Sequence, residues 1–263
     1  VPMAAAIWSA EPGSVLEMPV SFLVRFFANH GLLQVNDRPT WRVIKGGSRQ
    51  YVNKLVAGHR DRIRLNSPVD SVRRINGVVE IHSASGGREL FDHVFLACHS
   101  DQALALLKDA TPTEREVLGA IRYQRNEAVL HTDESLLPRR HRAWAAWNYH
   151  IPRDSGRHVA VTYNMNLLQG LDAGKQYCVT LNSDRRINPD KVIRRVQYEH
   201  PIYSREAVAA QARQADVNCE RTYFCGAYWR NGFHEDGVVS ALNAVDHFEQ
   251  RLADEQLHLR RAS

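Results

Sequence analysis

The chain has 263 residues, of which 44% are hydrophobic and 8% aromatic, so a disordered or fibrous protein is excluded and a core of good size can form. We expect two domains at this length. Lys and Arg number 34 against 29 Asp and Glu, a net charge of +5, but the basic residues are scattered and no zinc-finger, homeodomain or RNA-recognition signature accompanies them, so nucleic acid is not an expected partner.

The four cysteines are expected to be buried thiols in a reducing compartment, because they form no C-x-x-C pair. No apolar run approaches the roughly 20 residues of a membrane-spanning helix, and the start lacks a basic segment typical of a signal peptide. A cytoplasmic protein is therefore predicted. The chain opens without an initiator methionine, as if a longer chain had been cut.

The first predicted elements form an apolar region and a glycine turn. A helix is expected over residues 14–33, with Phe22, Leu23, Phe26 and Phe27 on one face and Gly31 as its end. A strand at 41–44 then precedes Gly46 and Gly47 and a short helix capped by Ser48, whose inward residues would be Tyr51, Val52, Leu55 and Val56. The two glycines indicate either a close approach to a ligand or a plain tight turn.

The middle of the chain alternates between sheets and helices. Asn76-Gly77 predicts a hairpin, Gly86-Gly87 a second turn, and residues 94–97 a strand covered on both faces. Two helical pieces broken near Pro112 follow. Residues 122–204 predict a second, antiparallel sheet, and a short helix then leads to a buried strand around Tyr223.

The last helix is expected to begin near Gly237, with Asp236 as its N-cap, because apolar residues follow helical spacing from Val238 onward. Free amides at a helix start suit a phosphate or a delocalised anion, and a glycine lets a planar ring come close. The alternative is a capped surface helix that binds nothing. His234 and Glu235 are expected to be loop or capping residues rather than ligands.

Four stretches together resemble the later part of flavin-dependent amine-oxidase-like proteins: "WRVIKGGSRQYVNKL", "SPVDSV", "HVFLAC" and "YFCGAYW…GFHEDGVVSAL". This superfamily includes amine oxidases, carotenoid desaturases and protoporphyrinogen oxidases, and the resemblance extends to bacterial predicted NAD/FAD-binding proteins. It implies an α/β (α+β mixed) fold. Residues 40–100 and 215–255 would belong to an FAD/NAD(P)-binding Rossmann-like domain, and residues 1–39 and 101–214 to an inserted substrate domain of antiparallel sheet and helices.

The resemblance also implies a set of cofactor contacts. Val69 matches the strand position that meets the adenine of FAD, and Gly226 matches the end of the strand beneath the cofactor. The helix start at the flavin pyrimidine edge corresponds to Gly237, Val238 and Val239, and Gly46 and Gly47 complete the candidate set. Two departures stand out: the G-x-G-x-x-G fingerprint is absent, and Ala227 replaces a common acidic residue. We therefore expect this chain by itself to hold FAD weakly or not at all.

The expected reaction is hydride transfer from an apolar or amphipathic substrate to FAD. The substrate wall would consist of Trp144, Trp147, Tyr149 and Tyr163, unless these are ordinary core aromatics. Asn126 matches the place where many amine oxidases carry a lysine near the flavin; a neutral amide orients water but adds no positive charge. An electron carrier or quinone is therefore the expected acceptor, in preference to oxygen.

Other chemistries lack their motifs. Neither H-E-x-x-H nor G-x-S-x-G occurs, so a metal site and a serine hydrolase are not expected. Two alternatives to an oxidoreductase stay open: a non-catalytic fragment or degenerate paralogue that acts as a scaffold, and a lipid-tail binding protein. Peripheral membrane contact is compatible with both. Substrate identity and oligomeric state are left open.

Overall fold

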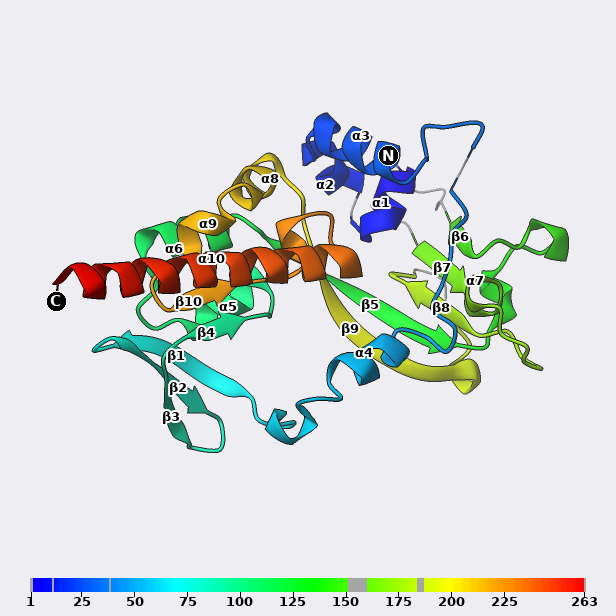
Figure 1. Ribbon diagram of the computed structural model, residues 1–263. Helices are drawn as coiled ribbons and strands as arrows, with labels where there is room; N and C mark the ends of the chain where they lie inside the picture. Colours follow the sequence, from blue (N-terminus) through cyan, green and yellow to red (C-terminus); the bar gives the residue numbers. More distant parts are fainter. Residues whose placement is uncertain (1, 11, 38, 151–159, 184–186, 263) are drawn as a thin grey trace. The chain divides into compact units, whose positions relative to one another are not determined.

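The computed structural model describes residues 2–10, 12–37, 39–150, 160–183 and 187–262 (Figure 1). It divides into two compact units, each built from two chain segments: unit 1 is Val1–Ile63 with Gln124–His200, and unit 2 is Arg64–Tyr123 with Pro201–Ser263. Residues 40–63, 101–123 and 201–214 thus group differently from the expected domains, and the functional roles of those domains stay predictions. Within the described ranges, no helix is long and apolar enough to span a bilayer.

Unit 1 begins with three short helices, α1 (Pro2–Trp8), α2 (Pro12–Glu17) and α3 (Val20–Asn29). The single helix predicted over 14–33 is wrong, because Pro19 cannot donate an amide and disfavours helical backbone at Met18. The predicted inward face is right in part. Phe22 and Phe26 are buried against Trp8, with ring centroids 5.8 and 4.7 Å away, whereas Leu23 and Phe27 are half-buried.

The next segment of unit 1 has little tertiary contact. Residues 41–44 do not form the predicted strand, because an extended segment needs a neighbouring strand to bind its backbone and none pairs with it in the described chain. The helix α4 (Arg49–Leu55) follows Ser48 as predicted, but the Ser48 side chain makes no capping bond. None of its residues is buried, so the predicted inward face is also wrong; Val52 and Leu55 are exposed.

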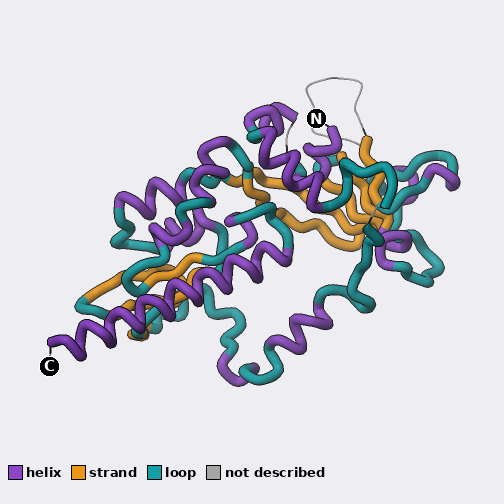
Figure 2. Tube along the Cα trace, turned by 45° about the horizontal axis from the view of Figure 1, so that its top comes forward, coloured by secondary structure: helices purple, strands orange, loops and turns teal. Residues whose placement is uncertain are grey.

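The second half of unit 1 is the predicted antiparallel sheet, drawn among the orange strands of Figure 2. Its five strands lie in the order β6-β7-β8-β5-β9. Adjacent strands are antiparallel from β6 through to β5. The strands are β5 (Tyr123–His131), β6 (Trp147–His150), β7 (Ala160–Asn164), β8 (Cys178–Leu181) and β9 (Val192–Pro201), and α7 (Met165–Gln169) follows β7. Short 3-10 helices lie at Glu134–Leu136, His141–Ala143 and Pro189–Lys191, and another lies at Arg60–Arg62, after α4.

Unit 2 contains a three-stranded antiparallel sheet in the order β1-β2-β3. Its strands are β1 (Val69–Ile75), β2 (Val78–Ser83) and β3 (Arg88–Phe91). The predicted hairpin is confirmed: Asn76 and Gly77 have φ values of 48° and 80°, which a tight turn with two left-handed residues requires. The turn at Gly86 and Gly87 joins β2 to β3 as expected.

A two-stranded parallel sheet and five helices form the rest of unit 2. The strands are β4 (Val94–Leu96) and β10 (Thr222–Phe224), and the helices are α5 (Ser100–Leu106), α6 (Pro112–Gly119), α8 (Arg205–Gln211), α9 (Gln214–Val217) and α10 (His234–Ala262). Phe95 is 40% exposed, so β4 is not covered on both faces as predicted. The break near Pro112 is confirmed by a capping box in which Thr111 and Glu114 satisfy each other's backbone amides.

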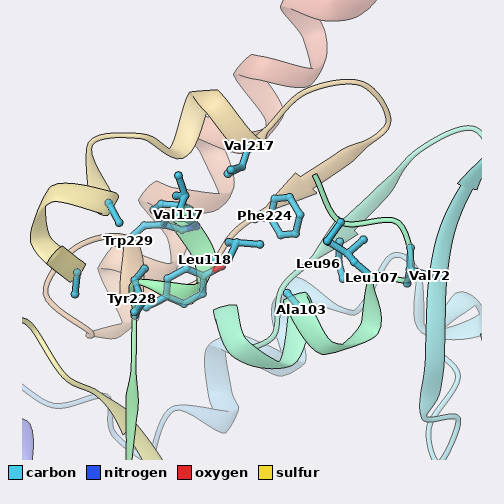
Figure 3. Close-up of a cluster of buried hydrophobic side chains, with 14 of the residues drawn as sticks. Val72, Leu96, Ala103, Leu107, Val117, Leu118, Val217, Phe224, Tyr228 and Trp229 are labelled. Carbon is cyan, nitrogen blue, oxygen red and sulfur yellow. The ribbon is translucent and has the colours of Figure 1, made fainter. Parts of the chain in front are cut away.

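The core of unit 2 joins these elements. Figure 3 shows Leu96 of β4, Ala103 of α5, Leu118 of α6 and Phe224 of β10 converging with Trp229, which follows β10. All five are buried, and burial of large apolar side chains is the main stabilising contribution to such a unit. The carboxyl end of β10 and the start of α10 are thereby anchored on a packed core.

Candidate functional site

The helix at the candidate flavin site begins one turn earlier than predicted. α10 starts at His234, and the Gly237 amide donates to the Phe233 carbonyl at 3.1 Å, so it already belongs to the helical ladder. Asp236 is not the N-cap: its carboxylate reaches back to accept from the Phe233 amide at 3.0 Å, as the third residue of a capping box does. The amides without a partner inside the helical ladder therefore precede Gly237.

At the start of α10, the positive end of the helix dipole is largely balanced by the carboxylate of Asp236. Asp236 is only 6% exposed, and its carboxylate lies against the positive end of the α10 dipole. Arg230 Nε lies 3.6 Å from Asp236 Oδ1 and offsets that negative charge in turn. An anionic group that approaches the helix start would thus meet a carboxylate and a guanidinium as well as backbone amides.

The structure brings Gly226 and Gly237 together at one junction. The Gly226 amide donates to Ser240 Oγ at 2.8 Å, and the same hydroxyl donates to the Gly237 carbonyl at 2.8 Å. A Cβ at Gly237 would have its nearest neighbour, the Ala227 amide nitrogen, at 4.0 Å, so the protein itself leaves room there. A Cβ at Gly226 would lie 2.4 Å from Tyr228 Cε1, so the Tyr228 ring explains that glycine without a ligand.

Of the other candidate cofactor residues, two directly follow Gly237 and three lie elsewhere. Val238 is 51% exposed and Val239 half-buried, both in the first turns of α10. Val69 opens β1, next to a bulge in its pairing with β2. Gly46 and Gly47 belong to unit 1, where both have φ of +81° and the Gly47 amide donates to the Ile44 carbonyl at 2.8 Å. The backbone conformation of this turn accounts for both glycines without any ligand, as the plain tight turn named as the alternative would.

Asn126 lies at the centre of a buried polar network in unit 1. It is 1% exposed; its Nδ2 bonds the Gln124 carbonyl at 3.1 Å and His200 Nδ1 at 2.8 Å. Its Oδ1 accepts from Gln124 Nε2 at 3.3 Å and from Asn182 Nδ2. Gln124 Nε2 also donates to the Ser9 carbonyl at 3.1 Å. All four hydrogen-bonding positions of the Asn126 amide are occupied by protein groups.

The sequence did not reveal this network. His200 is 74 positions from Asn126 and Asn182 is 56 positions away, and only pairing of the strands brings them together. No short motif connects such residues. Orienting a water would require Asn126 to give up one of these protein partners.

Three of the four predicted wall aromatics share one face of the unit 1 sheet. Trp147 is directly opposite Tyr163, with ring centroids 5.4 Å apart, and Tyr149 is on the same face as Trp147 because side chains alternate along a strand. Register carries this face across β7 and β8 to β5, where it includes Asn126. Trp144 precedes β6, stacks on His141 and donates its Nε1 to the Pro138 carbonyl at 2.8 Å.

On this face, none of the residues at paired positions of strands β5 to β8 is charged. Its members are Asn126, Ala128, Leu130, Trp147, Tyr149, Val161, Tyr163, Val179 and Leu181. Val161 and Leu181 are buried, whereas Trp147 and Tyr149 on the edge strand are 38% and 48% exposed. The face is apolar apart from its amide and the two phenol groups.

Comparison with known proteins gives a family and a fold. Residues 9–136 match the family of flavin containing amine oxidoreductases. No curated protein sequence matches the chain significantly. Among solved structures, cyclohexylamine oxidase from Brevibacterium oxydans IH-35A is similar with a TM-score of 0.61 and 12% identity, over 95% of this chain and 63% of that one.

Two other solved structures are also similar. A CLA-producing fatty acid isomerase from P. acnes has a TM-score of 0.59 and 15% identity, over 88% of this chain and 58% of that one. A putrescine oxidase bound to putrescine has a TM-score of 0.50 and 12% identity, over 78% of this chain and 53% of that one. The chain thus spans less than two thirds of the length of each. The predicted resemblance is confirmed: residues 9–136 match the family of flavin containing amine oxidoreductases, and the chain has the mixed helix and sheet fold of its structural neighbours.

Proposed function

We propose that the protein to which this chain belongs is an FAD-dependent oxidoreductase that transfers a hydride from an apolar or amphipathic substrate to the flavin. The match of residues 9–136 to flavin containing amine oxidoreductases carries this proposal. FAD, when bound, supplies the redox chemistry, and the protein supplies orientation, electrostatics and exclusion of water.

The junction of β10 and α10 fits one edge of such a cofactor. Gly237 has no side chain, and the open space at its Cβ position would admit a planar ring edge. The start of α10 presents the positive end of the helix dipole, and Arg230 adds a positive charge that Asp236 partly offsets. Val238 and Val239 would border the ring, while Val69 is the proposed adenine contact.

The substrate class follows from the uncharged face of the unit 1 sheet. Burial of a cationic amine is costly unless a carboxylate pairs with it, and over β5 to β8 the paired positions of this face carry no carboxylate. Trp147, Tyr149 and Tyr163 would contact apolar parts of the substrate.

The electron acceptor is proposed to be a carrier or quinone. Asn126 is neutral, and its amide is committed to Gln124, Asn182 and His200, so it offers no positive charge to promote reaction of the reduced cofactor with oxygen. Rapid mixing of the photoreduced intact protein with air-saturated buffer measures this rate. Reoxidation as fast as in typical oxidases would contradict the assignment.

Replacing Gly237 tests the proposed cofactor site. In the intact protein, Gly237→Val should lower the FAD content after gel filtration, because the new side chain occupies the space proposed for the ring edge, while circular dichroism shows α10 still formed. Ala253→Val is the matched control, since it adds the same side chain to an exposed position of the same helix. Equal FAD content in both variants and the wild type would refute the site.

A further inference from the structure

Two buried polar side chains, Gln214 and Ser240, form hydrogen bonds that connect the end of β10 to the first turns of α10. Ser240 is 0% and Gln214 is 7% exposed. Gln214 Nε2 donates to the Phe224 carbonyl in β10 and to the Ser240 carbonyl in α10, both at 3.0 Å. Ser240 Oγ then bonds the Gly226 amide and the Gly237 carbonyl.

These hydrogen bonds fix the backbone around Gly226, which lies outside any regular helix or strand. β10 ends at Phe224, so the Gly226 amide lies beyond the ladder with β4, and the Ser240 hydroxyl is the partner that satisfies it. A glycine has more backbone freedom than any other residue, so Gly226 needs such a fixed partner to keep one position. Asn243 Nδ2 in turn holds Gln214 Oε1 at 3.3 Å.

We infer that Ser240 is a positioning residue for the flavin: with Gln214 it fixes Gly226 against the start of α10 and so sets how closely the cofactor edge approaches the helix amides. This inference rests on the proposed function. A helix N-terminus stabilises the negative charge of a reduced flavin over a short range, about one helical turn. Loosening the junction should therefore lower both the affinity for FAD and its reduction potential.

The test compares two isosteric changes on the intact protein. Ser240→Ala removes the junction hydroxyl, and Thr222→Val removes a hydroxyl that is equally buried at the opposite end of β10, where it contacts Arg74. Ser240→Ala removes both hydrogen bonds of this hydroxyl, and we expect the loosened junction to raise the Kd for FAD about tenfold and to lower the midpoint potential. Thr222→Val should change stability but neither quantity.

A second measurement needs no cofactor. Hydrogen exchange of the Gly226 amide in the 263-residue chain should become faster in Ser240→Ala and stay protected in Thr222→Val. If Ser240→Ala does not fold, Ser240→Cys keeps the size with a weaker donor and should show intermediate shifts.

The outcomes distinguish the positioning role of Ser240 from the proposed function of the protein. If the wild-type intact protein binds FAD but Ser240→Ala matches Thr222→Val in Kd and potential, the positioning role is wrong and the proposed function stands. If the intact wild-type protein binds no FAD, both are wrong.

Discussion

Arg74 is predicted to be the most sensitive polar residue of unit 2. Its guanidinium is 10% exposed and binds Glu114 through two bonds of 2.7 and 2.9 Å, while Nε donates to Asp109 at 2.9 Å. Nη1 also reaches Thr222 Oγ1 at 3.1 Å. Burial lowers the pKa of Arg74, but the bonds to Glu114 and Asp109 outweigh burial and hold it above its ordinary value. The cluster joins β1, α6 and β10.

Arg74→Met should destabilise unit 2 by about 3–5 kcal/mol, because it leaves the carboxylate of Glu114, 1% exposed, buried without its cation. The double variant Arg74→Met/Glu114→Leu should recover part of this loss, since replacing both partners by apolar groups removes the unpaired charge. Arg64→Met is the matched control: Arg64 also binds a glutamate, Glu89, through two bonds, but its side chain is 67% exposed. We expect little change there.

The assay is urea unfolding followed by circular dichroism, with hydrogen exchange of peptides from β1 and α6 to assign the change to unit 2. A chain of two compact units need not unfold in a single two-state transition, so the local exchange data decide. A loss below about 1 kcal/mol for Arg74→Met, or the same loss for Arg64→Met, would show that the buried cluster contributes no more than a surface ion pair.

The remaining predictions concern pH and packing. Burial lowers the pKa of His131, so the unfolded chain takes up a proton at this residue at a higher pH than the folded chain does. The stability of unit 1 should therefore fall as the pH drops through the ordinary value of 6.5, and His131→Gln should flatten that slope. An equal slope in both proteins would contradict this. Gly226→Ala should cost about 1–3 kcal/mol in urea unfolding, because its Cβ would lie 2.4 Å from Tyr228 Cε1, whereas Gly237→Ala should be neutral or stabilising by up to about 1 kcal/mol.

Local chemistry allowed much of the fold to be predicted. Asn76-Gly77 defines a hairpin because few residues other than glycine and asparagine adopt the left-handed backbone of its turn. Thr111-Pro112 starts α6 because the cap and the fixed proline backbone act within one turn. The alternating strands of residues 122–204 predicted an antiparallel sheet, and the recognisable motifs predicted the family.

Tertiary structure decided what depends on partners far along the chain. Residues 41–44 have the composition of a strand but no strand to pair with in the part of the chain that the structure describes. The hydrogen bonds of the Asn126 side-chain amide depend on His200 and Asn182, and only the pairing of strands brings these two residues beside it. Likewise Ser240 gains its role from the Gly226 amide, 14 positions away, since a hydroxyl's function is set by the atoms that folding places within about 3 Å of it.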